Sequence, residues 1–314
     1  MIAQNDKERA PRNRTIELTD QEIKIYRERI VYSENNLQDF QNKIICGDAV
    51  ETFKRLPEKS FDLLFADPPY NLTKNFGENS FRQTSLEEYE LWLDSWLKET
   101  IRLLKPTASI YICGDWRSSS AIQRAGTKYF MPRNRITWER EKGRGASKNW
   151  KNAAEDIWFF TVSNDYVFNA EAVKIKRKVL APYKENGKPK DWENSDDGNF
   201  RLTAPSNLWT DLTVPFWSMR ENTMHPTQKP EKLLAKIILA SSNENDLVLD
   251  PFVGSGTTAV AAKKLNRNFA AIEADENYCF LAEKRLDLAE KDKTIQGFSG
   301  GIFWERNSQG KNKK

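Results

Sequence analysis

The stretch DLVLDPFVGSGTTAVAAKKL, residues 246–265, has the pattern of a strand, a glycine-rich turn and a helix. Gly254 permits a tight turn, and Gly256 lets a ligand approach the backbone without meeting a Cβ atom. Ser255 and Thr257 stand where the unpaired amides of the helix N-terminus point. This stretch therefore predicts a turn that binds a ligand at the carboxyl end of a strand.

An acid follows this turn at a spacing that suits a nucleoside. The run NFAAIE, residues 268–273, predicts a strand that ends in Glu273, whose carboxylate can accept hydrogen bonds from ribose hydroxyls. The pattern also fits the dinucleotide fingerprint, so an NAD-linked oxidoreductase is an alternative. Asp250 leads into the turn, and a carboxylate there suits an ammonium group better than a pyrophosphate. S-adenosylmethionine, a nucleoside joined to an amino acid, is therefore the preferred ligand.

A second motif occurs in LLFADPPYNL, residues 63–72, where a buried strand ends in an acid, two prolines and a tyrosine. The prolines exclude a helix and remove two amide donors. Asp67 and the Pro68 carbonyl are two hydrogen-bond acceptors, and Pro69 fixes the angle of that carbonyl. Tyr70 offers a flat ring for stacking. Two acceptors and a ring suit the exocyclic amine of a nucleobase turned out of its helix, with no need for a histidine.

The rest of the chain alternates between strand and helix patterns, which predicts an α/β fold with a mostly parallel, doubly wound sheet. We expect strands at 42–50, 61–66, 108–115, 134–140, 156–162, 246–250 and 268–273, and helices at 86–106, 230–242, 257–265 and 275–291. The alternation stops from about residue 170 to 220, which we interpret as an inserted recognition region. We expect residues 1–18 to be disordered and those after about 295 to be frayed.

Composition excludes several kinds of protein. The 314 residues contain three separated cysteines and one histidine, so zinc sites and histidine-dependent nucleophiles are excluded, and we predict no metal. Without a long apolar run or a secretory signal, we expect a cytoplasmic protein with no membrane contact. Basic residues cluster at 133–151, with Trp138 and Trp150 among them, and at 174–190. Such clusters favour binding to a phosphate backbone, and in the second we select Lys176, Arg177 and Lys178 as DNA-binding candidates.

These motifs resemble those of the DNA amino-methyltransferases, in which DPPY is the catalytic signature and DPFVGSGTT the S-adenosylmethionine loop. IICGDA before the catalytic strand and HPTQKP at 225–230 resemble the same family, and the similarity covers roughly residues 42–290. The order of the motifs is that of the beta class. The resemblance implies a Rossmann-like methyltransferase fold with a target-recognition region between the two halves.

The resemblance and the residue patterns together give a full set of candidate site residues. The catalytic candidates are Asp67, Pro68, Pro69 and Tyr70. The cofactor-binding candidates are Asp48, Asp67, Gln228, Lys229, Asp250, Phe252, Gly254, Ser255, Gly256, Thr257 and Glu273. His225 is expected to be a neutral packing residue. The predicted divisions are an N-terminal extension (1–36), a catalytic half (37–170), a target-recognition insert (171–220), a cofactor half (221–295) and a C-terminal tail (296–314).

The predicted reaction is site-specific methyl transfer to the 6-amino group of adenine in double-stranded DNA, with base flipping. Adenine is preferred because, in the family resembled, aspartate at the first motif position goes mainly with adenine. The alternatives are the 4-amino group of cytosine, an RNA or protein amide, and a catalytically idle DNA-binding module. A cognate restriction endonuclease is a possible partner, and the chain could act as a monomer or a homodimer.

Overall fold

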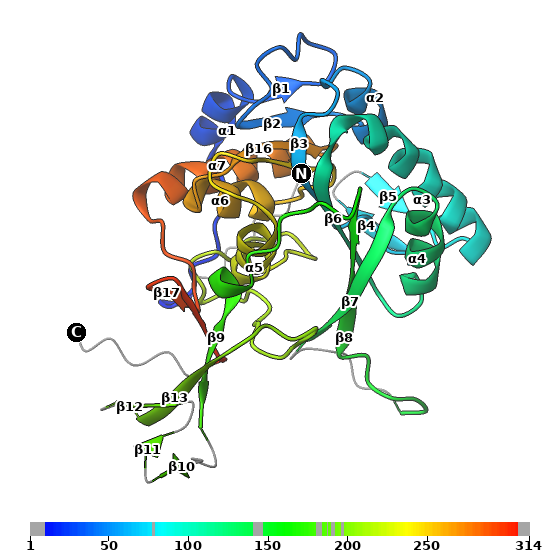
Figure 1. Cartoon of the computed structure of the whole chain (residues 1–314). Coiled ribbons are helices and arrows are strands. Elements are labelled where there is room, and N and C mark those ends of the chain that lie inside the picture. The colour runs from blue at the N-terminus through cyan, green and yellow to red at the C-terminus, as the bar shows by residue number, and fades with distance from the viewer. Residues whose placement is uncertain are drawn as a thin grey trace.

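The computed structural model describes residues 10–76, 79–140, 147–179, 184–186, 188–189, 192–195 and 198–306. A large mixed sheet runs through the molecule, and helices cover both of its faces (Figure 1). The predicted α/β fold with a mostly parallel sheet is confirmed.

The central sheet has nine strands in the described residues, and most neighbouring pairs in it are parallel. Two pairs are antiparallel, because β8 runs against both β6 and β7. In spatial order the strands are β1 (Val31–Tyr32), β2 (Lys43–Cys46), β16 (Asn268–Glu273), β15 (Leu247–Asp250), β3 (Phe61–Ala66), β6 (Leu104–Gly114), β8 (Ala154–Thr161), β7 (Met131–Glu139) and β14 (Leu208–Trp209).

The order of the strands reverses between β3 and β15, which lie side by side and pair Leu64 with Leu249. From β3 the chain continues to β6 on one side, whereas from β15 it continues to β16 on the other. Such a reversal opens a crevice beyond the carboxyl ends of the two strands, and open α/β sheets bind ligands there. The DPPY turn follows β3 and the glycine loop follows β15, so both motifs reach this crevice.

Seven α-helices in the described residues cover the sheet and form two apolar layers. They are α1 (Asp20–Arg27), α2 (Ala49–Phe53), α3 (Leu86–Thr100), α4 (Ser119–Thr127), α5 (Glu231–Ser241), α6 (Thr257–Lys264) and α7 (Glu276–Lys291). Helices α1, α5, α6 and α7 contribute to one layer, and α2, α3 and α4 to the other (Figure 1). In the part of the chain described, no helix combines the length and the apolar character needed to cross a membrane.

Several strands begin earlier than predicted, such as β6 at Leu104 and β7 at Met131, and two predicted elements end well before the expected residue. The helix expected at 86–106 ends at Thr100, and after a short 3-10 turn (Ile101–Leu103) the chain enters β6, where Leu104 pairs with Phe61 of β3. The strand expected at 42–50 ends at Cys46, because Asp48 caps α2. In both places the apolar pattern of the sequence continues past the end of the element. The pattern alone therefore does not show where the backbone leaves one element and enters the next.

The predicted insert contributes to a second, smaller sheet, with strands β12 (Glu193–Ser195), β13 (Gly198–Thr203) and β9 (Ile175–Lys178). Two strands from the end of the chain complete it: β18 (Ile302–Trp304) pairs with β9, and β17 (Phe298–Ser299) pairs with β18. The expectation of a frayed end was therefore wrong for residues 298–304. Phe303 is fully buried in a cluster that includes Val173 and Ile175, and this burial holds the segment in place.

The remaining described elements are short. They are the 3-10 helix Ala170–Val173 and the hairpins β4 (Lys74–Phe76) with β5 (Asn79–Phe81) and β10 (Lys184–Glu185) with β11 (Lys188–Pro189). Residues 1–9, part of the segment expected to be disordered, lie outside the described residues. Residues 10–18 contact the fold, since Ile16 forms a β-bridge with Thr223, so disorder was the wrong expectation there.

Candidate active site

A cavity of about 310 Å³ lies in the crevice between the two motifs. Its size is typical of small-molecule sites. Thirteen of the predicted catalytic and cofactor residues line it: Asp48, Asp67, Pro68, Pro69, Tyr70, Gln228, Lys229, Asp250, Phe252, Gly254, Ser255, Thr257 and Glu273. The fold thus brings together residues that lie as far apart in the sequence as Asp48 and Glu273.

Gly256 is the predicted cofactor residue that does not line this cavity. Its φ of +86° is left-handed, and an added Cβ would lie 2.6 Å from the Cβ of Ala282 on α7. A glycine is therefore required here by helix packing and backbone conformation, rather than by ligand approach as the sequence suggested. Gly254 does face the cavity, and an added Cβ there would lie 2.9 Å from Nε2 of His225.

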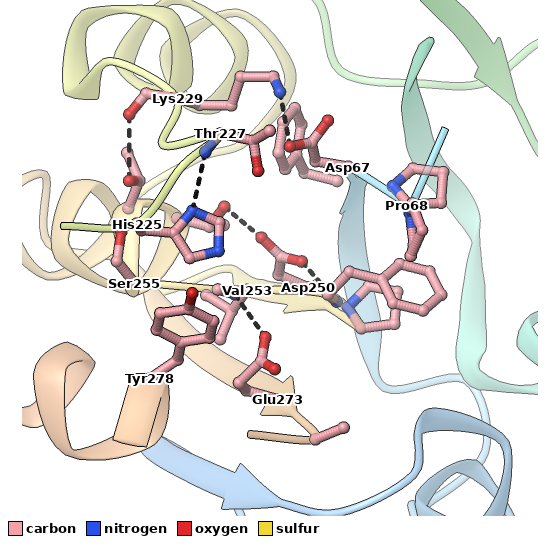
Figure 2. A pocket seen from close by; sticks show the side chains of 18 of the residues that line it. Asp67, Pro68, His225, Thr227, Lys229, Asp250, Val253, Ser255, Glu273 and Tyr278 are labelled. Carbon is pink, nitrogen blue, oxygen red and sulfur yellow. Dashed lines mark hydrogen bonds and ion pairs between the residues drawn. The ribbon is translucent and has the colours of Figure 1, made fainter. Parts of the chain in front are cut away.

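The DPPY turn is held by side chains from other elements. The Tyr89 hydroxyl donates to the Pro69 carbonyl at 3.0 Å. Lys229 Nζ donates to Asp67 Oδ2 at 2.6 Å, and the Tyr70 hydroxyl lies 3.0 Å from Asp67 Oδ1. Figure 2 shows Lys229 reaching across from the segment before α5 to meet Asp67. Both carboxylate oxygens of Asp67 therefore have a donor.

Sequence reasoning missed Glu155, a buried acid on β8 beside this turn. Glu155 Oε2 lies 3.0 Å from the Tyr70 hydroxyl and 3.5 Å from Lys229 Nζ, and Oε1 pairs with Arg140 at 2.6 Å. A signal was present, because Glu155 occupies the same alternating positions as Ile157 and Phe159, whose side chains are buried. An acid at a strand position whose side chain faces the core indicates a buried polar contact.

Burial dominates the ionisation of this cluster. It raises the pKa of Asp67, with Lys229 opposing the shift and Glu155 adding to it. Burial also raises the pKa of Tyr70 well above 10, and the carboxylates of Asp67 and Glu155 raise it further. Burial lowers the pKa of Lys229, but those same two carboxylates outweigh it, so the net shift is upward. The phenol and the ammonium thus stay protonated and act as donors.

The carboxylates of Asp250 and Glu273 hold the glycine loop by accepting from its backbone amides. Asp250 Oδ1 accepts from the Phe252 amide at 2.9 Å, and its Oδ2 accepts from the Thr258 hydroxyl. Glu273 accepts from the amides of Gly254 and Asp275, each at 2.9 Å. Burial raises the pKa of Glu273, and it raises that of Asp250 to about 7.

A buried arginine on α7 ties the loop to the rest of the site. Arg285 donates to the Ser255 carbonyl and to the Thr257 hydroxyl, both at 2.9 Å, and pairs with Glu231 at 3.1 Å. The Thr257 hydroxyl in turn donates to the Lys229 carbonyl at 3.1 Å. The segment that carries Lys229 is therefore bonded directly to the glycine loop.

Three further predicted residues have structural partners as well as a place at the cavity. Asp48 caps α2 by accepting from the Glu51 amide at 3.0 Å. Gln228 Oε1 accepts from the Thr223 amide at 2.9 Å, which folds the segment before α5. The His225 ring packs edge-on against Tyr278, with ring centroids 4.5 Å apart.

The predicted DNA-binding residues lie on β9 of the smaller sheet and do not line the cavity. Lys176 Nζ stands over the rings of Phe200 and Trp304, at 5.0 and 4.7 Å from their centroids. Arg177 pairs with Glu305 at 3.8 Å, whereas the Lys178 side chain is exposed. Parts of both basic clusters, including residues 141–146 and 180–183, lie outside the described residues.

Comparison with known proteins places these motifs in a family. Residues 61–284 match the family model described as DNA methylase. The Type II methyltransferase M.HpaI of Haemophilus parainfluenzae is 35% identical over 250 residues, which cover 78% of this chain and 74% of the relative. The DNA adenine methyltransferase YhdJ of Escherichia coli strain K12 is 36% identical over 253 residues, which cover 78% and 83%.

Solved structures agree with this match. The M1.HpyAVI–SAM complex aligns with a TM-score of 0.54 and 26% identity, over 78% of this chain and 98% of that one. The cytosine-N4-specific PvuII DNA methyltransferase aligns with a TM-score of 0.57 over 79% and 91%, and its 19% identity shows the fold alone. Because the family match takes in well over half of the sequence, this chain belongs to the DNA methylase family, as its two motifs predicted.

Proposed function

We propose that this protein transfers a methyl group from S-adenosylmethionine to the 6-amino group of adenine in duplex DNA. The observation that carries the proposal is the meeting of the DPPY turn and the glycine loop in one cavity at the reversal of strand order. For the base, the support is the relative named a DNA adenine methyltransferase, which is 36% identical.

The charges of the cavity fit this cofactor. Among the described residues that line it, four carry carboxyl groups and one carries an ammonium group: Asp48, Asp67, Asp250, Glu273 and Lys229. Carboxylates accept hydrogen bonds from ribose hydroxyls and attract a cationic ligand, whereas they repel a pyrophosphate. This argues against the NAD alternative. Glu273 and Asp48 would bind the nucleoside, and Phe252 would supply an apolar wall.

The chain's own residues prepare the base amine. This amine is a poor nucleophile because its lone pair is delocalised into the ring. Asp67 and the Pro68 carbonyl would accept its two hydrogens, favouring a pyramidal nitrogen with an exposed lone pair, and Tyr70 would stack on the ring. When bound, S-adenosylmethionine supplies an electrophilic methyl group. As the nitrogen formed its bond to the methyl carbon, the bond from that carbon to the sulfonium sulfur would break, a neutral thioether would leave, and the Asp67 carboxylate would accept the proton lost by the amine.

Recognition of the DNA sequence is assigned to the insert. We propose that residues 171–220 form the target-recognition region between a catalytic half (37–170) and a cofactor half (221–295), with an extension (1–36) and a tail (296–314) outside them. The position of Lys178, exposed on β9 of the smaller sheet, supports a backbone contact by this region. The two strands that residues 298–304 add to the same sheet make part of the tail a structural support for it.

The proposal is tested by the identity of the product. The protein is expressed in a host that lacks adenine methylation, and the DNA is digested to nucleosides and separated by mass spectrometry. We expect 6-methyladenine from the wild type and none from Asp67→Ala. Exclusive 4-methylcytosine would overturn the choice of base, and an unmodified genome would contradict the proposed activity.

A restriction–modification setting is a further part of the proposal, since M.HpaI is named a Type II methyltransferase. If this chain has a cognate endonuclease, DNA from the expressing host should resist that enzyme at the methylated sequence. Cleavage of fully methylated sites would contradict this pairing without affecting the assignment of the reaction.

A further inference from the structure

The observed contacts of Asp67 conflict with its proposed use. Its two oxygens already accept from Lys229 at 2.6 Å and from the Tyr70 hydroxyl at 3.0 Å. Lys229 is only 6% exposed in its side chain, so this ion pair is shielded from water. These donors occupy two of the roughly four acceptor sites of the carboxylate, and the ammonium competes with the base amine for its charge. If Lys229 moves away from Asp67 when the amine binds, the buried ammonium needs another partner.

Both donors already lie within reach of a single alternative acceptor, Glu155. The Tyr70 hydroxyl is 3.0 Å from Glu155 Oε2, the same distance as from Asp67. Lys229 Nζ is 3.5 Å from that same oxygen, within the range of an ion pair. The phenol has one proton to donate, so it can serve either carboxylate without moving its ring.

The surroundings of Glu155 suit this exchange. Arg140 pairs with Oε1 at 2.6 Å, which leaves Oε2 for the two donors. A small cavity of about 80 Å³ borders Arg140, Glu155 and Lys229, so the ammonium has room to move. Trp138, whose buried indole N–H has no hydrogen-bond partner within the described residues, also borders this cavity.

We propose that Glu155 is a positioning residue that accepts the Lys229 ammonium and the Tyr70 hydroxyl when Asp67 binds the base amine. The inference rests on the proposed function. The cluster contains two carboxylates and two cations, of which Arg140 is partly exposed, so the exchange changes partners without changing the net charge of the cluster. Glu155 thereby frees the Asp67 carboxylate while keeping Lys229 paired.

Substitution of Glu155 by glutamine tests the charge at nearly constant volume. In Glu155→Gln, the amide oxygen could still accept from Tyr70 but would carry no charge to hold an ammonium, so Lys229 would stay on Asp67. We expect kcat to fall about 10–100-fold, with KM for DNA and the Kd of S-adenosylmethionine within about twofold of wild type. Turnover is measured by tritium transfer to unmethylated plasmid DNA, and Kd by calorimetry.

Asp156→Asn is the matched control. Asp156 is the next residue on β8 and points to the opposite face, where it accepts from Ser119 at 2.7 Å and Thr137 at 3.1 Å. The control removes a carboxylate from the same strand without touching the cluster. We expect its kcat to stay within about twofold of wild type. If the kcat of Asp156→Asn fell as much as that of Glu155→Gln, both effects would be due to disturbance of β8, and the inference would be overturned.

Glu155→Asp separates a charge acceptor from a packing residue. Aspartate restores the charge but is one methylene shorter, whereas glutamine keeps the shape and loses the charge. The inference predicts that the aspartate variant is the more active of the two, and a packing role predicts the reverse order. A glutamine variant with wild-type kcat would also overturn the inference. If the wild type transferred no methyl group to DNA, that result would contradict the proposed function rather than this inference. Binding of S-adenosylmethionine is measured separately, by calorimetry.

Discussion

The DPPY turn and the glycine loop both begin with Asp-Pro at the end of a strand, yet the two aspartates have different partners. Asp67 accepts from two side chains, Tyr70 in the same turn and Lys229 in the segment before α5. Asp250 accepts from the Phe252 amide of its own turn and from Thr258 on α6. Both donors of Asp67 are side chains, which can move away when a substrate arrives, whereas one of the two donors of Asp250 is a backbone amide that the fold fixes. The first aspartate is thus suited to exchange partners and the second to hold a loop.

The largest effect is expected for Asp67→Ala, because it removes the proposed acceptor for the base amine. The kcat should fall by about 10²–10⁴-fold or more. Both Asp67→Ala and Asp67→Asn leave Lys229 with Glu155 as its nearby carboxylate. Because Asp67→Asn keeps the volume, comparing the two variants separates the loss of charge from the loss of volume. Turnover is measured with plasmid DNA, and folding by circular dichroism. Wild-type turnover in both variants would contradict the catalytic role of this turn.

Glu273→Ala should affect the cofactor rather than the base. Loss of one or two hydrogen bonds to the ribose should cost roughly 1–3 kcal/mol, or about 5–150-fold in the Kd of S-adenosylmethionine. Glu273→Gln keeps an acceptor and should lose less. Calorimetry in the absence of DNA gives both values. If the Kd were unchanged in both variants, Glu273 would not bind the cofactor and would serve to hold the Gly254 amide.

Asp250→Asn should change the pH dependence of stability. Burial raises the pKa of Asp250 from its ordinary 3.8 to about 7 in the folded protein. Its contribution to stability is therefore fully present below pH 3.8 and is lost as the pH rises towards 7. The melting temperature of the wild type should fall by a few degrees relative to that of the variant across this range. Thermal unfolding from pH 4 to 8 measures the difference, and a constant difference would show that Asp250 is ionised throughout.

The smallest effect is expected for Lys178→Glu, which lies far from both turns in the sequence and is exposed on β9. Loss of one phosphate contact should lower the salt dependence of DNA binding by about one unit of log–log slope, with the Kd of S-adenosylmethionine unchanged. Lys174→Glu, a partly buried residue just before β9, is a charge-matched comparison. Fluorescence anisotropy at several salt concentrations measures the slope. An unaltered slope would leave Lys178 as a solvated surface charge.

Local sequence patterns predicted the two turns well because each is contiguous and combines unusual residues, prolines in one and glycines in the other. They placed Asp67, Asp250 and Glu273 at one edge of the sheet, and the structure has them lining one cavity. The same patterns gave no sign that Lys229 bonds Asp67, since the two are 162 residues apart and meet only once the sheet is assembled.

Long-range pairing also explains what was missed. Glu155 reaches the site because β8 runs antiparallel between β6 and β7, an arrangement that no local periodicity encodes. Gly256 was assigned to the ligand because its packing partner, Ala282, is on another helix. Residues 298–304 were expected to be frayed because two very short strands have little pattern of their own.

The way in which β18 completes the smaller sheet has a consequence for engineering. The surface proposed for sequence recognition contains two separate segments, residues 171–220 and residues 298–304, which meet where Phe303 pairs with Ile175. A chimera that exchanges only residues 171–220 with a relative would graft a foreign strand onto the native terminal hairpin. Successful exchange of specificity between such enzymes should therefore require that both segments are exchanged together.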